Sequence, residues 1–581
     1  MASLVSGLDN ISKQNNMNIG ENAHAQHSWT HANFEHDLVQ LYFQLVRIPK
    51  YDHTRMKSVT SKYLTLVDNA VENNNERQIN YCMSLLFQTR DVCGGKGEYA
   101  LFYNLLKVWE PYFLNPAIRS KFTRALDLCF NTNDTEFDKP YGSWKDVKYI
   151  LEHWRQVEEC ATCYMQLNWH KFPLLKYIIQ KTVKSFILDQ NSENPSLLAR
   201  WLPREKSAFG WQAAIFAEGL YIHSNNLSNV SLTLTSSQKR GIMRNYRKVL
   251  GDLNRKLGTI QINQAGKDWK SIDFAKQGTS LTLQRQKKAF LCDGKNQNAS
   301  SEPDRISCRS NYLDYIKDCA AGKKQMKSKR LSLGEMVKDA WMHWNDDCVE
   351  ATAVNVAWKH HDDISAKFSD CVALLDTSAS MTWENCPLYD ATGIALKIAE
   401  SSTLGKRVMT FASQPAWVNL ENCDNLCSMV DTLKQNFSGT STNIYAALNL
   451  IAAACVEQNL DPTVVENINL VILSDMQINQ ADPNWNSLDS NIVTLFKESG
   501  MKTTHGKPYS PPTIIYWNMR NTDGFPCSTV RENVIMVSGY SIDVLKSVFV
   551  NGPEALKTMK PWDALSATLE ANRYSWFWEE C

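Results

Sequence analysis

Residues 371–380 read CVALLDTSAS, an apolar run that ends at an aspartate followed by hydroxyl-bearing residues. A short, continuous apolar run bounded by turn residues is typical of a strand that is buried on both faces of a sheet. Amphipathic helical stretches and further apolar runs, such as LVIL at residues 470–473, alternate after it. Strands that alternate with helices predict an α/β domain with a mostly parallel sheet over residues 370–581.

Oxygen-bearing side chains follow these predicted strands. Asp376 comes directly after the first strand, with Ser378 and Ser380 close behind it, and Asp475 follows a later strand. Thr442 lies between them, in a Gly- and Thr-rich loop before a helix. Ligands of open α/β sheets bind at the carboxyl ends of the strands, and carboxylates with hydroxyls suit a hard cation. Although such residues also serve as turns and helix caps, three loops in this order predict a Mg²⁺ or Mn²⁺ site.

The predicted metal loops contain no histidine or cysteine that could act as a general base or nucleophile. His505 lies in a loop rich in lysine and proline and is expected to be solvated. We therefore expect no enzyme but a docking site, whose open coordination position accepts a carboxylate from an acidic protein partner. A metal-dependent hydrolase is the alternative for this part of the chain.

Residues 34–358 have a helical pattern instead. Stretches such as 34–48 and 76–90 repeat apolar residues at i, i+3, i+4 and i+7. Consecutive helices with short connections predict antiparallel pairs and are compatible with a solenoid, although no sharp repeat is visible. Residues 1–33, rich in Asn, Gln, Ser and His, are predicted to be a disordered arm, and 359–369 to connect the helical and α/β domains.

Charge is distributed unevenly along the chain, although the net charge is only +1. Residues 371–581 hold 13 basic and 22 acidic residues, a net charge of −9, whereas 231–330 hold 22 basic and 8 acidic residues, a net charge of +14. This asymmetry indicates a polyanionic partner for the basic segment. A solvated helical surface, or a basic face that docks on the acidic domain of the same chain, is the alternative.

Hydropathy and cysteine usage limit the cellular setting. No run of about 18 apolar residues is present, so no membrane span is expected, and the N-terminus has no secretory signal pattern. Several of the 16 cysteines, such as Cys371 and Cys455, lie in apolar runs that are typical of buried free thiols. Cys160 and Cys163 form a C-x-x-C without a second ligand pair, which favours a structural over a zinc-binding interpretation. These features predict a reducing, cytoplasmic location.

The five oxygen-bearing residues resemble the metal-ion-dependent adhesion site of von Willebrand factor A domains, which have a Rossmann-like α/β fold. The family pattern is Asp-x-Ser-x-Ser, a threonine in a second loop and an aspartate in a third. Thr440 and Ser441 are close to the second position, but the distance of Thr442 from the following helix matches the family pattern better. The resemblance implies the same five metal ligands.

Three strings of the helical part, RDVCGGKGE (90–98), YGSWKDV (141–147) and LARWLPREKSA (198–208), resemble the DUF-2828 family of plants and large DNA viruses. That family is similar to the TROVE plus von Willebrand factor A architecture of the Ro ribonucleoprotein autoantigen. The resemblance extends from about residue 35 to the end and implies a HEAT-like, TROVE-like helical ring that binds RNA. It departs at Cys93, where family members often have a basic residue. GGKG lacks the spacing of a phosphate-binding loop, so no nucleotide site is predicted.

Resemblance and charge together predict a non-catalytic RNA-binding protein of Ro type, with structured or single-stranded RNA as partner and no membrane. Lysine and arginine would contact phosphates, and interleaved aromatics could stack on bases unless they belong to the core, which is favoured for Tyr246 and Phe290. These aromatics are Tyr246, Trp269, Phe274, Phe290, Tyr312 and Tyr315. The alternative is a protein-interaction scaffold that uses the metal site without nucleic acid. The candidate RNA-binding residues lie on two helical stretches and are Lys239, Arg240, Arg244, Arg247, Lys248, Lys287 and Lys288.

Overall fold

The computed structural model divides the chain into two compact units. The α/β unit comprises Met1–Thr89, Gly94–Leu101 and Gln325–Glu579, and the helical unit is formed chiefly by Arg90–Cys93 and Phe102–Lys324. The structure describes residues 17–19, 25–29, 31, 33–130, 140–158, 167–225, 227, 234–292, 302–328, 331–343, 348–361, 370–383, 386–437, 439–478, 488–544, 549 and 553–579.

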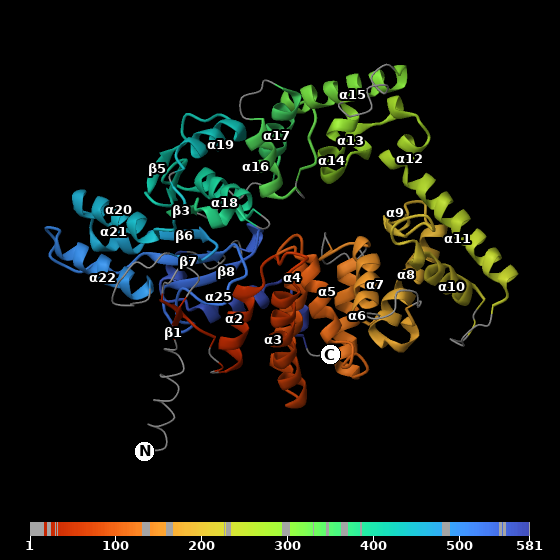
Figure 1. The fold of residues 1–581 in the computed structure, drawn as a ribbon, viewed down its shortest axis with the longest axis horizontal. Helices are drawn as coiled ribbons and strands as arrows, with labels where there is room; N and C mark the ends of the chain where they lie inside the picture. Colours follow the sequence, from red (N-terminus) through yellow and green to blue (C-terminus); the bar gives the residue numbers. More distant parts are fainter. Residues whose placement is uncertain are drawn as a thin grey trace. The chain divides into compact units, whose positions relative to one another are not determined.

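A six-stranded sheet forms the centre of the α/β unit (Figure 1). Its order is β5-β4-β3-β6-β7-β8, and all neighbours are parallel except β5, which runs antiparallel to β4. In chain order this is the 3-2-1-4-5-6 arrangement of doubly wound folds. The predicted α/β class is thereby confirmed. The strands are β3 (Cys371–Asp376), β4 (Arg407–Phe411), β5 (Ala416–Asn419), β6 (Asn469–Ser474), β7 (Thr513–Asn518) and β8 (Val534–Ser538).

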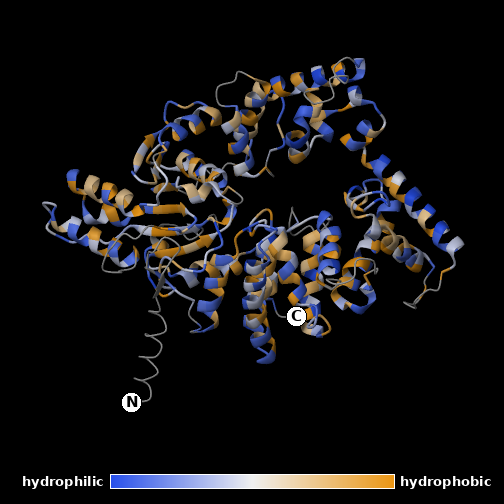
Figure 2. Cartoon of the chain, viewed as in Figure 1, coloured by the Kyte–Doolittle hydropathy of each residue, from blue (hydrophilic) through white to orange (hydrophobic). Residues whose placement is uncertain are grey.

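Four of the parallel strands are buried along their whole length and are mostly apolar. Every residue of β3, β6, β7 and β8 is buried, and Figure 2 shows sheet strands largely in the hydrophobic colour. Helix α18 packs against β3, and α20 against β4. The helices of this part of the unit are α16 (Leu333–Met342), α17 (Val349–Lys359), α18 (Pro387–Ser401), α19 (Leu426–Gln435), α20 (Ile444–Glu457), α21 (Pro462–Glu466), α22 (Leu488–Met501), α24 (Pro553–Leu556) and α25 (Pro561–Leu569).

Segments from the N-terminal region complete the α/β unit. Helix α2 packs against β8 and α25. Residues 519–533, which connect the parallel strands β7 and β8, contain no helix, although such crossovers usually carry one. Part of the predicted arm is ordered, because β1 and β2 pair with each other and His27 exchanges two backbone hydrogen bonds with Phe525. These elements are β1 (Met17–Ile19), β2 (Ala25–His27), α2 (Phe34–Gln44), α3 (His53–Glu72) and α4 (Glu76–Arg90).

Lys96, the lysine of the GGKG string, fastens the end of α2 to the end of β8. Its side chain is buried, and Nζ donates to Tyr42 O at 2.6 Å, Leu45 O at 3.0 Å and Ser538 Oγ at 2.6 Å. Nζ also lies 3.7 Å from the centre of the Tyr42 ring. Burial holds the pKa of Lys96 well below its ordinary value. Because these acceptors belong to the protein itself, Lys96 has a structural role that does not need a bound phosphate.

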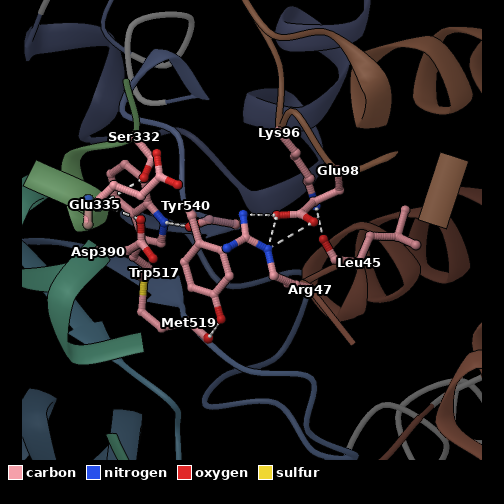
Figure 3. A network of polar contacts seen from close by, with 12 residues as sticks. Leu45, Arg47, Lys96, Glu98, Ser332, Glu335, Asp390, Trp517, Met519 and Tyr540 are labelled. Atoms are coloured by element: carbon pink, nitrogen blue, oxygen red, sulfur yellow. Dashed lines mark hydrogen bonds and ion pairs between the residues drawn. The ribbon is translucent and has the colours of Figure 1, made fainter. Parts of the chain in front are cut away.

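An ion pair continues the same clamp (Figure 3). Arg47 Nη2 lies 2.9 Å from Glu98 Oε1, and its guanidinium stacks 4.5 Å from the centre of the Tyr540 ring. The Tyr540 hydroxyl donates to Met519 O at 2.7 Å, in the loop that follows β7. Burial raises the pKa of nearby Asp390 to about 6, an effect that the positive charge of Arg47 partly offsets. The RDVCGGKGE string is therefore divided between the two units, and its Lys96 and Glu98 serve the α/β unit.

The helical unit consists, in its described residues, of helices and connecting segments. Helix α11 illustrates how the sequence fixes the two ends of a helix. Thr235 caps its first turn in a capping box with Gln238, and Gly258 ends it with φ +51°. The predicted helical class of this region is confirmed. Its helices are α5 (Tyr99–Val108), α6 (Pro116–Phe130), α7 (Lys145–Glu158), α8 (Pro173–Asn191), α9 (Leu198–Trp201), α10 (Ala213–Ser224), α11 (Ser236–Leu257), α12 (Ile260–Ala265), α13 (Phe274–Gln277), α14 (Ser280–Phe290) and α15 (Pro303–Ala320).

Two further expectations from the sequence concern membrane spans and cysteines. Among the residues that the structure describes, no helix is long and apolar enough to cross a bilayer. The described cysteines are free thiols, and Cys371 and Cys455 are buried, as their apolar surroundings predict. Cys160 and Cys163 lie outside the described residues, as does most of the predicted connection at 359–369.

Lys96→Met tests the clamp, because methionine fills the space of lysine but leaves the buried acceptors of Lys96 without their donor. We expect the free energy of unfolding to fall by about 2–4 kcal/mol. Urea unfolding of the full chain measures this change. Lys57→Met is the matched control, because Lys57 is exposed on α3. Equal stability of the two variants would contradict the role assigned to Lys96.

Candidate metal centre

The sheet order brings the two predicted ligand carboxylates to the same crevice. Asp376 is the last residue of β3, and Asp475 follows β6 directly. β3 and β6 are parallel neighbours, and the strand order reverses between them. In open α/β sheets this switch point is where the loops diverge and ligands bind. Chain topology alone thus places both carboxylates where a ligand is expected.

The first loop turns immediately after Asp376. One carboxylate oxygen, Oδ1, accepts a hydrogen bond from the Ser378 backbone N at 2.9 Å. The hydroxyls of Ser378 and Ser380 lie 3.1 Å apart. Asp376 and Ser378 are buried, and Ser380 is half-buried at the start of a 3-10 turn, Ala379–Thr382. The structure therefore brings the three ligand residues of the Asp-x-Ser-x-Ser motif together.

The second loop lies against the first. The Ala379 backbone N donates to Thr440 O at 3.2 Å, which ties the two loops together. Thr442 is buried, whereas the hydroxyl of its neighbour Ser441 is engaged with Ser413 Oγ at 2.9 Å. Asn443 then caps α20 by accepting from Ala446 N. Because the Ser441 hydroxyl already has a partner, Thr442 is the better candidate ligand, in agreement with the choice made from its spacing.

The third loop holds Asp475 in a constrained backbone. Met476, the next residue, has φ +61°, a left-handed conformation that side chains other than glycine rarely adopt. This turn lets Gln477 N donate to Asp475 Oδ1 at 3.2 Å. Strained residues persist where the surrounding structure fixes them, commonly at functional sites.

Two buried carboxylates in one crevice disfavour each other's ionised form. Burial first, and the negative charge of Asp475 second, raise the pKa of Asp376 to about 7. Without a cation, a proton on Asp376 relieves the repulsion at neutral pH. A divalent cation relieves it better, because it interacts with both charges at once.

The site contains two side chains that the sequence analysis missed. Ser474 Oγ donates to Asp376 Oδ2 at 2.6 Å, so both oxygens of this carboxylate are oriented by hydrogen bonds. Arg520, in the loop after β7, places Nη1 3.7 Å from Asp475 Oδ2. Ser474 could have been found from its position beside Asp475. Arg520 could not, because no motif surrounds it and only the sheet order brings β7 next to β6.

The loop that carries Arg520 is also joined to α2. Asn518 Nδ2 donates to Phe43 O at 2.9 Å, and Asn521 Nδ2 donates to Gln44 O at 2.5 Å. The Arg520 backbone N donates to Asn518 Oδ1 at 3.0 Å. One short loop therefore contacts both the candidate metal centre and the docked helix.

The donor set fits a hard cation. The predicted ligands offer carboxylate and hydroxyl oxygens only, the set that Mg²⁺ and Mn²⁺ accept. In the part of the chain that the structure describes, no group of three or more His, Cys, Asp or Glu side chains is placed to hold a metal. An oxygen-lined site that depends on hydroxyls is consistent with that result. Arg520 supplies one positive charge at this site and would compete with the cation for Asp475.

The predicted RNA-binding residues lie on two helices of the helical unit. On α11, the side chains of Lys239, Arg240, Arg244, Arg247 and Lys248 are all exposed. Arg247 forms an ion pair with Glu205, with Nη1 2.9 Å from Oε2. On α14, Lys287 is half-buried and Lys288 is exposed. The α11 residues thus form an accessible basic helix.

Most of the aromatic residues of 231–330 belong to the core, as the sequence favours for Tyr246 and Phe290. Tyr246 is buried and donates to Pro203 O at 2.8 Å, and Phe274, Phe290 and Tyr312 are buried and pack on one another with ring centres 5.0–5.4 Å apart. Helical spacing had placed them on the core side of their helices. They are not available to a nucleic acid.

Asp376→Asn tests the metal centre, because it removes one of the two ligand carboxylates while keeping the shape of the side chain. We expect Mn²⁺ affinity to fall by roughly a hundredfold or more. In EDTA the variant should unfold at the same or a higher temperature than the wild type, because a costly buried charge is gone. Calorimetric titration with MnCl₂ and thermal unfolding measure these effects. Asp424→Asn, at an exposed position, is the control, and unchanged Mn²⁺ affinity in Asp376→Asn would overturn the ligand assignment.

Arg520→Gln should strengthen cation binding, because it removes a positive charge that competes for Asp475. We expect Mn²⁺ affinity to rise about five- to tenfold. Arg531→Gln is a matched control, since Arg531 pairs with Asp489 at 3.0 Å, away from the ligands. If Arg520→Gln bound Mn²⁺ more weakly than the wild type, Arg520 would be a supporting residue and not a competitor.

The chain is similar to one known domain and to one viral protein. Residues 370–570 match the model of a domain of unknown function, DUF7788. The chain is 26% identical over 476 residues to an uncharacterized protein, L728, of Acanthamoeba polyphaga mimivirus. The aligned region covers 81% of this chain and 76% of the viral protein. That source is a large DNA virus, consistent with the expectation from the sequence. No solved structure matched the chain. The matched domain model covers the sheet and the predicted ligand loops, and the viral similarity extends beyond that domain.

Proposed function

We propose that the protein is a non-catalytic RNA-binding protein of Ro type whose α/β unit, of the von Willebrand factor A kind, docks an acidic partner through a divalent cation. The observation that carries this proposal is that Asp376 and Asp475 end adjacent parallel strands at the switch point, beside the hydroxyls of Ser378 and Ser380. A cation held there by few direct ligands keeps a coordination position for a carboxylate of the partner.

The strand order supports the assignment to the von Willebrand factor A kind. The sheet is doubly wound, its one antiparallel strand, β5, lies at an edge, and the three ligand loops all lie at the carboxyl edge of the parallel strands. The family resemblance gives the same ligands in the same chain order. We favour docking over hydrolysis because the described residues of the predicted ligand loops supply carboxylate and hydroxyl oxygens but no histidine or cysteine.

The helical unit supports RNA as its ligand. Residues 231–330 carry a net charge of +14, from 22 basic and 8 acidic residues, and the basic side chains of α11 are exposed. Phosphate contacts of this kind give affinity without sequence preference. The scaffold without nucleic acid is the second candidate, and the burial of the central aromatics favours it, because those rings cannot stack on bases.

Salt dependence of RNA binding distinguishes these two functions. Affinity of the full chain for loop-containing RNA should fall steeply with salt, with a log–log slope of roughly −0.7 per phosphate contacted. Arg244→Glu combined with Lys248→Glu should weaken binding to all sequences about equally and flatten the slope. Asp376→Asn should leave RNA binding nearly unchanged. Filter binding at several salt concentrations measures this. A wild-type protein without RNA affinity at low salt would leave the scaffold as the function.

A further inference from the structure

Three segments of the helical unit meet around a group of cations and rings. Helix α7 contributes Lys145, Lys148 and Tyr149, and α9 with the segment after it contributes Arg200, Trp201 and Phe209. Helix α14 adjoins them, because Arg200 Nη2 donates to Thr282 Oγ1 at 3.2 Å. We call the six residues of α7, α9 and the following segment the cation–aromatic cluster. Two of the strings quoted from the sequence, YGSWKDV and LARWLPREKSA, supply three of its members, Lys145, Arg200 and Trp201.

Each cation of the cluster lies against an aromatic ring. Lys148 Nζ is 4.9 Å from the centre of the Trp201 ring, 5.3 Å from that of Phe209 and 5.3 Å from that of Tyr149. Lys145 Nζ is 5.4 Å from the Tyr149 ring, and Arg200 Cζ is 5.4 Å from the Trp201 ring. All six side chains are half-buried, so solvent reaches the cluster. This arrangement places positive charge and accessible ring surface side by side.

Lys148 and Arg200 are the two cations of the cluster whose charges no described carboxylate balances. Among the residues that the structure describes, neither Lys148 nor Arg200 has a carboxylate partner. Asp146, the carboxylate next to Lys145 in the chain, is engaged elsewhere. It accepts hydrogen bonds from Arg90, the Tyr103 hydroxyl and the Ser143 backbone N.

Like charges and partial burial make the cluster unfavourable without an anion. Burial, and then the charge of Arg285 on α14, lower the pKa of Lys145. Burial, and then the charge of Lys145, lower the pKa of Lys148. Burial also lowers the pKa of Arg200. An anionic ligand would relieve this repulsion, because it would supply an opposite charge beside Lys148 and Arg200.

We propose that the cation–aromatic cluster is a binding site for unpaired RNA, with the cations on phosphates and the rings stacked on bases. The proposal rests on the RNA-binding function proposed above and names its ligand class and a second site for it, separate from α11. Cations alone would accept any polyanion, but the accessible rings favour a ligand that also presents an aromatic face. Paired RNA hides its base faces within the helix, whereas unpaired nucleotides can offer them. The flexible Lys148 side chain can move onto a phosphate while a base takes its place over Trp201.

The site is tested by fluorescence anisotropy of the full chain with a labelled oligouridylate and with a blunt RNA duplex of equal length. Wild-type protein should bind the oligouridylate more tightly than the duplex. Lys148→Glu should weaken oligouridylate binding about tenfold and reduce the magnitude of the salt slope by at least roughly 0.7. Lys184→Glu, at an exposed position on α8, is the matched control and should keep most of the affinity. Circular dichroism confirms that both variants are folded.

A second pair of variants tests the stacking part. Trp201→Phe should retain most of the affinity, whereas Trp201→Ala should lose about fivefold or more without a change in salt slope. If Trp201→Ala does not fold, the comparison of Lys148→Glu with Lys184→Glu decides. Equal binding by those two charge variants, or equal affinity for oligouridylate and duplex, would overturn the proposed site while RNA binding as such stands. Absence of any RNA binding by wild-type protein at low salt would overturn both.

Discussion

The repulsion between two buried carboxylates is the constraint on which the α/β unit depends. Asp376 and Asp475 end adjacent parallel strands, so the fold forces them into one crevice. Hydrogen bonds from Ser378 and Ser474 orient the first carboxylate, and Arg520 lies beside the second. A proton, the arginine and a divalent cation are three ways of balancing this charge, and the cation would also offer a coordination position to a partner's carboxylate.

The segment that carries Arg520, which lies beside Asp475, also forms hydrogen bonds with the end of helix α2. Asn518 and Asn521 flank Arg520 and donate to the carbonyl groups at the end of that helix. Lys96 donates to the same end of the helix and to Ser538 at the end of β8. A cation that displaces Arg520 from Asp475 would therefore act on a loop that is attached to α2. The structure gives a physical route by which occupancy of the metal centre and packing of the N-terminal helices influence each other.

Local patterns in the sequence predicted the parts of the fold that depend on local chemistry. The apolar runs identified β3 and β6, and the helical period identified α4. The short edge strand β5 was missed, because it has four residues and alternates in exposure. An edge strand paired on one side needs no continuous apolar run.

Only part of the candidate site could be predicted from the sequence. The motif predicted five oxygen-bearing residues, and the two carboxylates among them lie at the ends of adjacent strands that the sequence reveals. Long-range partners could not be identified: Arg520 reaches Asp475 through sheet order, and Lys96 reaches Ser538 across 442 positions of the chain. The sequence allowed two interpretations of the aromatic residues of 231–330, as a stacking surface or as core residues. Their burial and ring contacts in the structure show that most of them are core residues.

The central claim, that the crevice between β3 and β6 holds a divalent cation, is tested most directly by anomalous scattering from crystals grown with MnCl₂. The account predicts an anomalous peak bounded by Asp376, Ser378, Ser380, Thr442 and Asp475, with direct oxygen ligands at about 2.0–2.2 Å, and the Arg520 guanidinium displaced from Asp475. A crevice without a peak at saturating Mn²⁺, with Arg520 still beside Asp475, would contradict it.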